Sequence, residues 1–173
     1  MNNSTITLSK KELADHVKNN VVCFGFHALQ SDLNLFICAT PLGIINAVFC
    51  NINDTKLTKG LLNHYPLRRA ATPEELTQLL QSPTLVLTGT PFQQKVWQLL
   101  LTIPTGITTH YQAVAHALGA PTAYRAVANA IGANNHAWFI PCHRVIKKNG
   151  SLCGYRWGVA TKERLLNLEI QLH

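Results

Sequence analysis

A thiol and an imidazole stand side by side at Cys142 and His143, directly after Pro141. A cysteine attacks as its thiolate, and a histidine that takes the thiol proton, directly or through water, makes a buried cysteine a nucleophile. Adjacent side chains of an extended strand point to opposite faces, so this pair can cooperate only where the backbone bends or a water bridges them. Pro141 favours the end of a strand over its middle. The pair alone is also compatible with an ordinary buried cysteine beside a surface histidine.

The composition is that of an ordinary globular chain with reduced thiols. Its 173 residues, 47% hydrophobic and 13% charged, can hold one domain or a small domain attached to another. No apolar run approaches the roughly 20 residues that span a bilayer, and the first residues lack the pattern of a signal peptide, so we expect a cytoplasmic protein. An odd number of widely spaced cysteines without a Cys-x-x-Cys pair argues against a disulfide framework and against structural zinc. The cysteines are Cys23, Cys38, Cys50, Cys142 and Cys153.

The net charge of +7 is concentrated in the second half of the chain. Residues 1–90 carry seven Lys or Arg against six Asp or Glu, a net charge of +1. Residues 91–173 carry eight against two, a net charge of +6. A concentrated positive charge commonly serves a polyanion, most often nucleic acid, although a merely soluble basic surface is an alternative. Cys142 lies within the basic half.

The elements that must position the cysteine divide at about residue 88. Residues 1–88 predict a small α/β domain, because capping signals alternate with runs of β-branched and aromatic residues. The predicted elements are a helix over 10–17, strands over 21–28, 33–40 and 44–49, helices over 57–63 and 73–81, and a strand over 84–87. Residues 89–173 predict a mainly helical domain. The fold class is therefore α/β.

Capping signals in the second domain predict three helices before the cysteine. The first is capped by Thr90 and stops before Pro104, the second is capped by Thr109 and ended by Gly119, and the third starts at Pro121 and runs to about Gly132. Two short helices joined by a turn that contains glycine have the form of a helix-turn-helix. We therefore expect a DNA-binding motif immediately before the cysteine segment.

The third of these helices is lined with small residues and carries a single charge, Arg125. Its small residues are Ala123, Ala126, Ala128 and Ala130. Small side chains permit tight packing inside the core, and they equally permit close approach to DNA, with Arg125 as the long side chain that enters a groove. Composition leaves both interpretations open.

Several short motifs between residues 89 and 169 keep a recognisable order and spacing. They are Gly89-Thr90-Pro91-Phe92-Gln93, Val96-Trp97, Ile103-Pro104, Tyr111, Arg125-Ala126-Val127, Asn134, Pro141-Cys142-His143-Arg144-Val145, Gly154-Tyr155, Lys162 and Leu165-Leu166 with Glu169. Together they resemble the O6-alkylguanine-DNA alkyltransferases, suicide methyltransferases that repair alkylated bases, whose signature is Pro-Cys-His-Arg-Val. The resemblance covers nearly half of the chain and is fainter over the hairpin at 33–49. It also implies a ribonuclease-H-like first domain.

The run Gly154-Tyr155-Arg156-Trp157-Gly158 most resembles the alkyltransferase domain of the bacterial adaptive-response regulator. That regulator also has an N-terminal zinc domain and a transcription-factor domain. The chain is too short for them and lacks clustered cysteines, so we expect a stand-alone repair protein.

The resemblance implies a chemistry for the cysteine. Cys142 thiolate attacks the alkyl carbon on guanine O6 in a displacement that leaves the base repaired. The chief expected substrate is O6-methylguanine, and O4-methylthymine is a further one. His143 takes the thiol proton through a bound water, and Glu169 orients and charge-stabilises the imidazole. A solvated helix-end carboxylate is the alternative interpretation of Glu169. Asn134 braces the turn that carries Cys142, and the Tyr111 hydroxyl assists proton transfer at the base. The thioether product makes each molecule act once, and no metal or organic cofactor is implied.

The resemblance also implies the partner, double-stranded DNA bound through its minor groove by a monomer. The target atom is inaccessible in a stacked duplex, so the nucleotide must rotate into a pocket. Arg125 then fills the vacated stack and Tyr111 presses on the target phosphate, while Ala123, Ala126 and Ala128 line the approach of the helix. Binding should be mostly indifferent to sequence and should weaken steeply as salt rises.

The resemblance places the alkyl pocket at Val145, Tyr155, Arg156 and Trp157, as its floor and lip. The bulk of Trp157 predicts that methyl is accepted much more readily than benzyl.

Three departures from the family pattern concern DNA affinity more than chemistry. Asn135 stands where proline is usual, Ala128 and Asn129 replace small residues that are often glycine, and Tyr124 stands beside Arg125 where a small residue is usual.

Two other classes of function remain as alternatives. A helix-turn-helix regulator with a redox- or alkylation-sensing Cys142 would bind specific sequences, usually as a dimer. A thiol hydrolase using Cys142, His143 and Glu169 would turn over many times.

Overall fold

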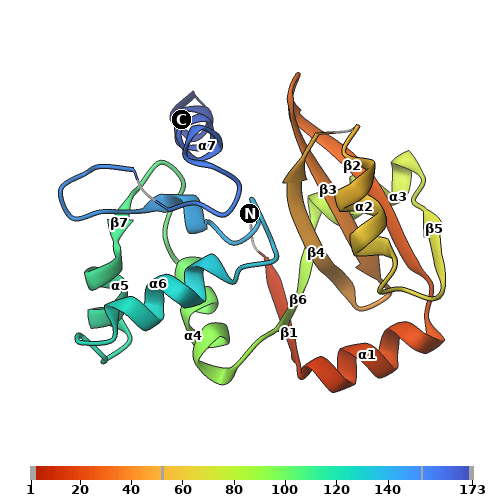
Figure 1. Ribbon diagram of the computed structural model, residues 1–173, viewed down its shortest axis with the longest axis horizontal. Helices are drawn as coiled ribbons and strands as arrows, with labels where there is room; N and C mark the ends of the chain where they lie inside the picture. The colour runs from red at the N-terminus through yellow and green to blue at the C-terminus, as the bar shows by residue number, and fades with distance from the viewer. Residues whose placement is uncertain (1–2, 52, 153, 172–173) are drawn as a thin grey trace. The chain divides into compact units, whose positions relative to one another are not determined.

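The computed structural model describes residues 3–51, 53–152 and 154–171 (Figure 1). The chain forms two compact units, Met1–Gly89 and Thr90–His173. The first contains a β-sheet with helices and the second is mainly helical, which agrees with the predicted α/β class. Cys153 lies outside the described residues.

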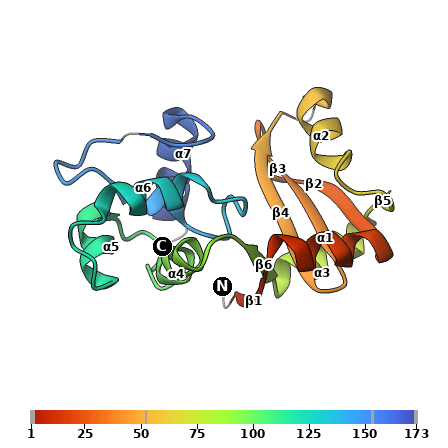
Figure 2. The same ribbon diagram turned by 60° about the horizontal axis from the view of Figure 1, so that its bottom comes forward.

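The first unit is built on one six-stranded sheet with the order β1-β6-β4-β3-β2-β5 (Figures 1 and 2). Strands β2, β3 and β4 are antiparallel neighbours, whereas β1 pairs with β6, β6 with β4 and β5 with β2 in parallel. The elements are β1 (Ser4–Leu8), α1 (Lys10–Asn19), β2 (Val22–Gln30), β3 (Leu33–Thr40), β4 (Gly43–Cys50), α2 (Thr55–Leu62), β5 (Arg68–Ala70), α3 (Pro73–Gln81) and β6 (Thr84–Thr88). Strands β3, β4 and β6 supply most of the buried core of this unit.

Two glycines allow close packing in this sheet. A Cβ atom at Gly25 of β2 would lie 2.6 Å from Leu76 of α3, so glycine lets the helix approach the strand. Gly43, at the start of β4, has a φ of +133°, and a Cβ atom there would lie 2.3 Å from the carbonyl oxygen of Thr84. Only glycine adopts that backbone conformation readily, which explains the turn between β3 and β4.

The predicted elements of the first unit are present, and two strands escaped prediction. Strand β1 precedes the predicted helix and pairs with β6, with Thr5 opposite Leu85. It is a short polar edge strand, and its pairing partner lies about 80 residues away in the sequence. Strand β5 has only three residues, all exposed. Neither segment carries the run of apolar residues from which a strand is recognised.

The second unit consists of helices and one short parallel strand pair. Its elements are α4 (Pro91–Leu100), β7 (Thr109–His110), α5 (Tyr111–Ala117), α6 (Tyr124–Gly132), a 3₁₀ turn η1 (Cys142–Arg144), β8 (Val145–Ile146) and α7 (Val159–Gln171). Helix α4 begins at the predicted cap, since the Thr90 hydroxyl accepts a hydrogen bond from the Gln93 amide. Trp97 of α4 donates its indole N–H to the carbonyl oxygen of Ala130 at 2.8 Å, which ties α4 to α6.

Two predicted helix starts were wrong. Thr109 lies in β7, and His110 caps α5 instead, because its Nδ1 accepts a hydrogen bond from the Ala113 amide at 3.1 Å. The helix expected from Pro121 begins at Tyr124, after a turn closed by the hydrogen bond from the Ala123 amide to the Ala120 carbonyl. The fixed φ of proline suits a turn as well as a first helical position, so the signal was ambiguous.

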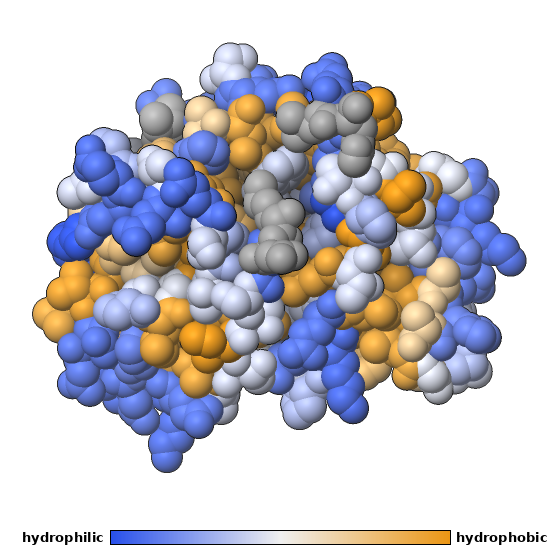
Figure 3. Space-filling model, turned by 180° about the vertical axis from the view of Figure 1, so that it is seen from behind, coloured by the Kyte–Doolittle hydropathy of each residue, from blue (hydrophilic) through white to orange (hydrophobic). Residues whose placement is uncertain are grey.

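No helix among the described residues combines the length and the apolar character needed to cross a membrane. On the face shown in Figure 3, hydrophobic and hydrophilic residues alternate in small patches.

Candidate active site

The nucleophile candidate lies in a backbone bend of the second unit. Cys142 begins the 3₁₀ turn η1, and hydrogen bonds from the Cys142 amide to the Ile140 carbonyl and from the Arg144 amide to the Pro141 carbonyl close the bend. Cys142 is 2% exposed and His143 is fully buried. The bend that cooperation between adjacent side chains requires is therefore present.

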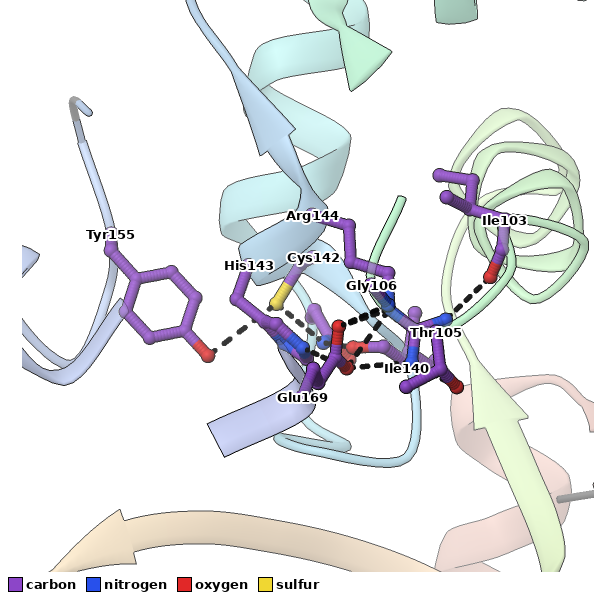
Figure 4. Close-up of polar contacts among 10 residues, drawn as sticks. Ile103, Thr105, Gly106, Ile140, Cys142, His143, Arg144, Tyr155 and Glu169 are labelled. Carbon is purple, nitrogen blue, oxygen red and sulfur yellow. Dashed lines mark hydrogen bonds and ion pairs between the residues drawn. The ribbon is translucent and has the colours of Figure 1, made fainter. Parts of the chain in front are cut away.

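Asn134 and Tyr155 reach the sulfur from opposite parts of the sequence. The Asn134 Nδ2 donates to the Cys142 Sγ at 3.1 Å and to the Ile140 carbonyl at 3.3 Å. The Asn134 Oδ1 accepts from the His136 amide at 2.8 Å, so the buried side chain is held at both ends. The Tyr155 hydroxyl lies 3.9 Å from Sγ and faces it in Figure 4. Both groups can donate a hydrogen bond to a thiolate.

Burial keeps the resting thiol protonated. It raises the pKa of Cys142 above the ordinary value, while the hydrogen bonds from Asn134 and Tyr155 and the positive charge of Lys162 oppose that rise. A nucleophile in this state needs a base that removes its proton during the reaction.

His143 has the protonation state of such a base. Its Nε2 lies 2.8 Å from Glu169 Oε1, and because an ionised carboxylate only accepts hydrogen bonds, Nε2 carries the proton. Burial lowers the pKa of His143, although the Glu169 carboxylate opposes this effect, so the imidazole is neutral. Its Nδ1 is buried without a hydrogen-bond partner among the described residues. That nitrogen is left with a lone pair that can accept a proton.

Glu169 is held in its ionised form by several donors (Figure 4). Arg144 donates from Nε to both carboxylate oxygens at 3.0 Å and from Nη2 to Oε1 at 2.6 Å, and the Gly106 amide donates to Oε2 at 3.2 Å. Burial would raise the pKa of Glu169, but the hydrogen bonds from His143 and Arg144 outweigh it and lower the pKa to about 2. The alternative interpretation, a solvated carboxylate at a helix end, is therefore not what the structure contains, since Glu169 is 1% exposed.

Arg144 is itself held by hydrogen bonds to residues other than Glu169. Its guanidinium donates to the carbonyl oxygen of Ile103 and to the Thr105 Oγ1. The sequence placed Arg144 inside the signature motif without giving it a role. Its position identifies it as the residue that fixes Glu169 and, through Glu169, His143.

Trp138 covers the ring of His143. The two rings are nearly parallel, with an interplanar angle of 7° and centroids 6.0 Å apart. Trp138 has a φ of 70°, in the left-handed region that residues other than glycine rarely adopt. Nothing in the sequence predicted this conformation.

Lys162 contacts Val145 and Tyr155, two of the predicted pocket residues. It is fully buried on α7, its Nζ donates to the Val145 carbonyl at 2.5 Å, and it lies 5.9 Å from the centre of the Tyr155 ring. Burial, together with the neighbouring Cys142, raises the pKa of Tyr155 well above the ordinary value, so its hydroxyl stays neutral and can donate. Lys162 was noticed only as part of the family pattern.

The remaining predicted pocket residues lie next to Tyr155. Trp157 packs edge-on against the Tyr155 ring, with centroids 5.2 Å apart. The Arg156 Nη1 donates to the Asn134 carbonyl at 3.1 Å and to the Asn135 Oδ1 at 2.7 Å. Val145 is buried directly after the cysteine turn.

The residues predicted to contact DNA lie on α5 and α6. Tyr111 is the first residue of α5 and directly follows β7, which pairs with β8 after the cysteine turn. Arg125 is exposed on α6, and its guanidinium lies 5.8 Å from the centre of the Tyr124 ring. Ala126 is exposed, and Ala123 and Ala128 are half-buried.

Helix α6 buries one of its small residues, Ala130, and exposes another, Ala126. Val127, Ala130 and Ile131 are the buried residues of α6, so Ala130 belongs to the core.

Within the part of the chain that the structure describes, no three His, Cys, Asp or Glu side chains are grouped to hold a metal ion.

Comparisons with known proteins match the second unit most strongly. The family model described as 6-O-methylguanine DNA methyltransferase, DNA binding domain, matches residues 91–171. The Escherichia coli K12 protein named "Bifunctional transcriptional activator/DNA repair enzyme Ada" is 55% identical over 83 residues, covering 48% of this chain and 23% of that protein. The chain spans between 23% and 47% of the length of the curated relatives that it matches.

Solved structures match nearly the whole chain. The O6-methylguanine methyltransferase of Mycobacterium tuberculosis is 31% identical with a TM-score of 0.69, covering 88% of this chain and 93% of that one. A second structure from that organism, an OGT in complex with DNA, is 32% identical with a TM-score of 0.68, covering 87% and 93%.

Proposed function

This chain belongs to the O6-methylguanine-DNA methyltransferase family, and we propose that it repairs DNA by moving an alkyl group, chiefly methyl, from guanine O6 to its own Cys142. The observation that carries this proposal is the buried Cys142 thiol beside a neutral His143. The Nε2 of His143 donates a hydrogen bond to the ionised Glu169 carboxylate, which leaves Nδ1 free to take a proton. O4-methylthymine is a second proposed substrate. The named relatives are methyltransferases or DNA repair enzymes, which supports the same activity here.

The proposed reaction is a displacement at carbon. The proton of the Cys142 thiol passes through a water molecule to Nδ1 of His143, and the sulfur forms a bond to the alkyl carbon as the bond from carbon to O6 breaks. The electron pair of the broken bond stays on the guanine, which takes up a proton with the help of the Tyr111 hydroxyl. The product thioether has no ready leaving group at neutral pH, so each molecule acts once.

The surrounding residues fit this sequence of events. Asn134 donates a hydrogen bond to the sulfur, and the Tyr155 hydroxyl accepts one from the resting thiol. Once the thiol loses its proton, both groups would donate to the thiolate and stabilise it. Glu169, ionised and fully hydrogen-bonded, would stabilise the positive charge that His143 acquires. Trp157 beside Tyr155 would bound the alkyl pocket together with Val145 and Arg156.

We propose double-stranded DNA as the partner, bound by a monomer through the minor groove. Helices α5 and α6 pack together in the arrangement proposed as a helix-turn-helix, and residues 91–173 carry a net charge of +6. The exposed Arg125 would fill the place of the rotated nucleotide, Tyr111 would press on its phosphate, and Ala126 would allow α6 to approach closely.

The first unit is proposed to be ribonuclease-H-like. Its three-stranded antiparallel meander, extended by the parallel strands β6 and β1, is the feature that supports this finer class. We also propose, as a separate point, that the protein is located in the cytoplasm.

A count of turnovers tests the proposed function. With a large molar excess of duplex containing O6-methylguanine, the number of repaired guanines should level off at one per protein molecule. Continued repair beyond that plateau would contradict a single-use acceptor and favour a turnover enzyme.

A further inference from the structure

The segment 154–158 belongs to no helix or strand. It carries Tyr155 and Trp157, which together form one wall of the proposed pocket. Gly154 and Gly158 at its ends have φ values of 39° and 92°, which allow the chain to turn sharply at both places. One backbone hydrogen bond, from the Gly158 amide to the Tyr155 carbonyl at 3.0 Å, closes a turn within the segment, and side-chain contacts tie it to the cysteine and to the turn after α6. Tyr155 and Trp157 therefore depend on what holds this segment.

Arg156 supplies such a contact. Its Nη1 donates to the Asn135 Oδ1 at 2.7 Å and to the Asn134 carbonyl at 3.1 Å, and its guanidinium carbon lies 5.8 Å from the centre of the Trp157 ring. A hydrogen bond from a charged donor at 2.7 Å is among the stronger ones that proteins make. Arg156 thus joins the pocket wall to the turn that follows α6.

Two consecutive residues of that turn hold the two parts of the site. Asn134 donates to the Cys142 sulfur, and Asn135 accepts from Arg156 in the pocket wall. The wall is also tied to the sulfur directly, since the Tyr155 hydroxyl lies 3.9 Å from Sγ and Trp157 packs on the Tyr155 ring. The turn at residues 134–135 therefore contacts both the nucleophile and the pocket wall.

We propose that Asn135 and Arg156 form a positioning pair that holds Tyr155 and Trp157 close to Cys142 and restricts the pocket to small alkyl groups. The assignment depends on the proposed function. Without the contact, the segment 154–158 can move away from the sulfur and admit a larger group, whereas methyl transfer needs no such space. A proline at position 135, which the family usually has, carries no side-chain acceptor for Arg156.

The ratio of benzyl to methyl transfer rates tests this pair. Rates are measured with duplexes that contain O6-benzylguanine or O6-methylguanine, for the unaltered protein and for Asn135→Ala, Arg156→Ala and both together. The ratio should rise about tenfold in Asn135→Ala, as expected for loss of one hydrogen bond to a charged group. It should rise at least as much in Arg156→Ala, which also loses the hydrogen bond to the Asn134 carbonyl. The double variant should give the same ratio as Arg156→Ala, because the Asn135 side chain acts on the pocket wall only through Arg156.

Two control variants separate the contact from general effects. Asn135→Asp keeps an acceptor for Arg156 and should keep the ratio at or below that of the unaltered protein. Asn167→Ala removes an exposed asparagine on α7 and should leave the ratio unchanged.

The outcomes distinguish this inference from the function on which it depends. An unchanged ratio in Asn135→Ala, even with both rates lowered, would overturn the positioning role while leaving methyl transfer established. A rise in Arg156→Ala alone would also overturn it, because Arg156 would then act by a contact other than Asn135. An unaltered protein that transfers neither group would overturn the proposed function itself, and this inference with it.

Discussion

His143 Nε2 lies 2.8 Å from Glu169 Oε1, and both side chains are almost completely buried. The contact assigns the imidazole proton to Nε2 and leaves Nδ1 as the basic nitrogen. It joins residues 26 positions apart, from the cysteine turn and from α7. The reactivity proposed for Cys142 depends on this pair, because burial raises the pKa of the thiol.

Replacing Glu169 with glutamine should slow alkyl transfer. Glutamine keeps an oxygen for the His143 N–H but removes the charge that stabilises a protonated imidazole. Exchanging the charged acceptor for a neutral one weakens that hydrogen bond and predicts a rate lower by about tenfold to a hundredfold. Single-turnover rates on methylated duplex measure this effect, and a rate equal to that of the unaltered protein would show that the charge is not used.

Replacing Arg144 with methionine should destabilise the fold. The variant leaves the buried Glu169 carboxylate with fewer donors, and breaking a buried ion pair from one side costs roughly 3 kcal/mol. Urea unfolding measures the loss of unfolding free energy. The matched control is Arg69→Met, which breaks an exposed pair with Glu75 and should cost far less. Equal losses in the two variants would contradict the structural role of Arg144.

Stability should fall as the solution is acidified below neutral pH. The pKa of His143 is lowered in the folded protein, so below the ordinary value of 6.5 the unfolded chain binds a proton that the folded chain does not. The pKa of Glu169 is lowered to about 2 from 4.5, so its contribution is present above pH 4.5 and is lost only as the pH falls toward 2. The loss of stability between about pH 7 and pH 4.5 therefore comes from histidine rather than from Glu169.

Urea unfolding across this pH range checks the assignment. His143→Asn should flatten the decline between about pH 7 and pH 5, because the variant has no imidazole at that position to titrate. The pKa of His27 is also lowered by burial, and His27→Asn measures its separate contribution. An equally steep decline in His143→Asn would contradict a neutral, buried His143.

Replacing Arg125 with alanine should affect duplex DNA alone. The exposed side chain on α6 is proposed to fill the vacated stack, so its loss should slow repair in a duplex by about tenfold or more, the scale of a few kcal/mol of unstacking. Transfer from free O6-methylguanine base should keep its rate, since no nucleotide has to rotate. A parallel fall with both substrates would place Arg125 in the chemistry or in the fold instead.

Sequence predicted best what depends on neighbouring residues. Thr90 and Pro91 located the start of α4 correctly, because a cap and its first turn are local. Thr109 and Pro121 misled, since a threonine also suits a strand and a proline also suits a turn. The left-handed backbone of Trp138 had no signal in the sequence, because residues other than glycine rarely adopt it.

The candidate site was predicted from a family pattern, and its contacts were not. Cys142, His143, Glu169 and Asn134 were expected to act together, and the structure brings them together. The contact between Arg144 and Glu169 spans 25 residues, and that between Asn135 and Arg156 spans 21. Spacing along a chain cannot predict such pairs until the turns between them are known.

The mass of the peptide that contains Cys142, after incubation of the protein with duplex O6-methylguanine, tests the central claim most directly. The account predicts one added methyl group on that peptide, with guanine restored in the DNA, and no added methyl in Cys142→Ala. An unmodified Cys142 peptide from folded protein, or a methyl group carried by another residue, would contradict it.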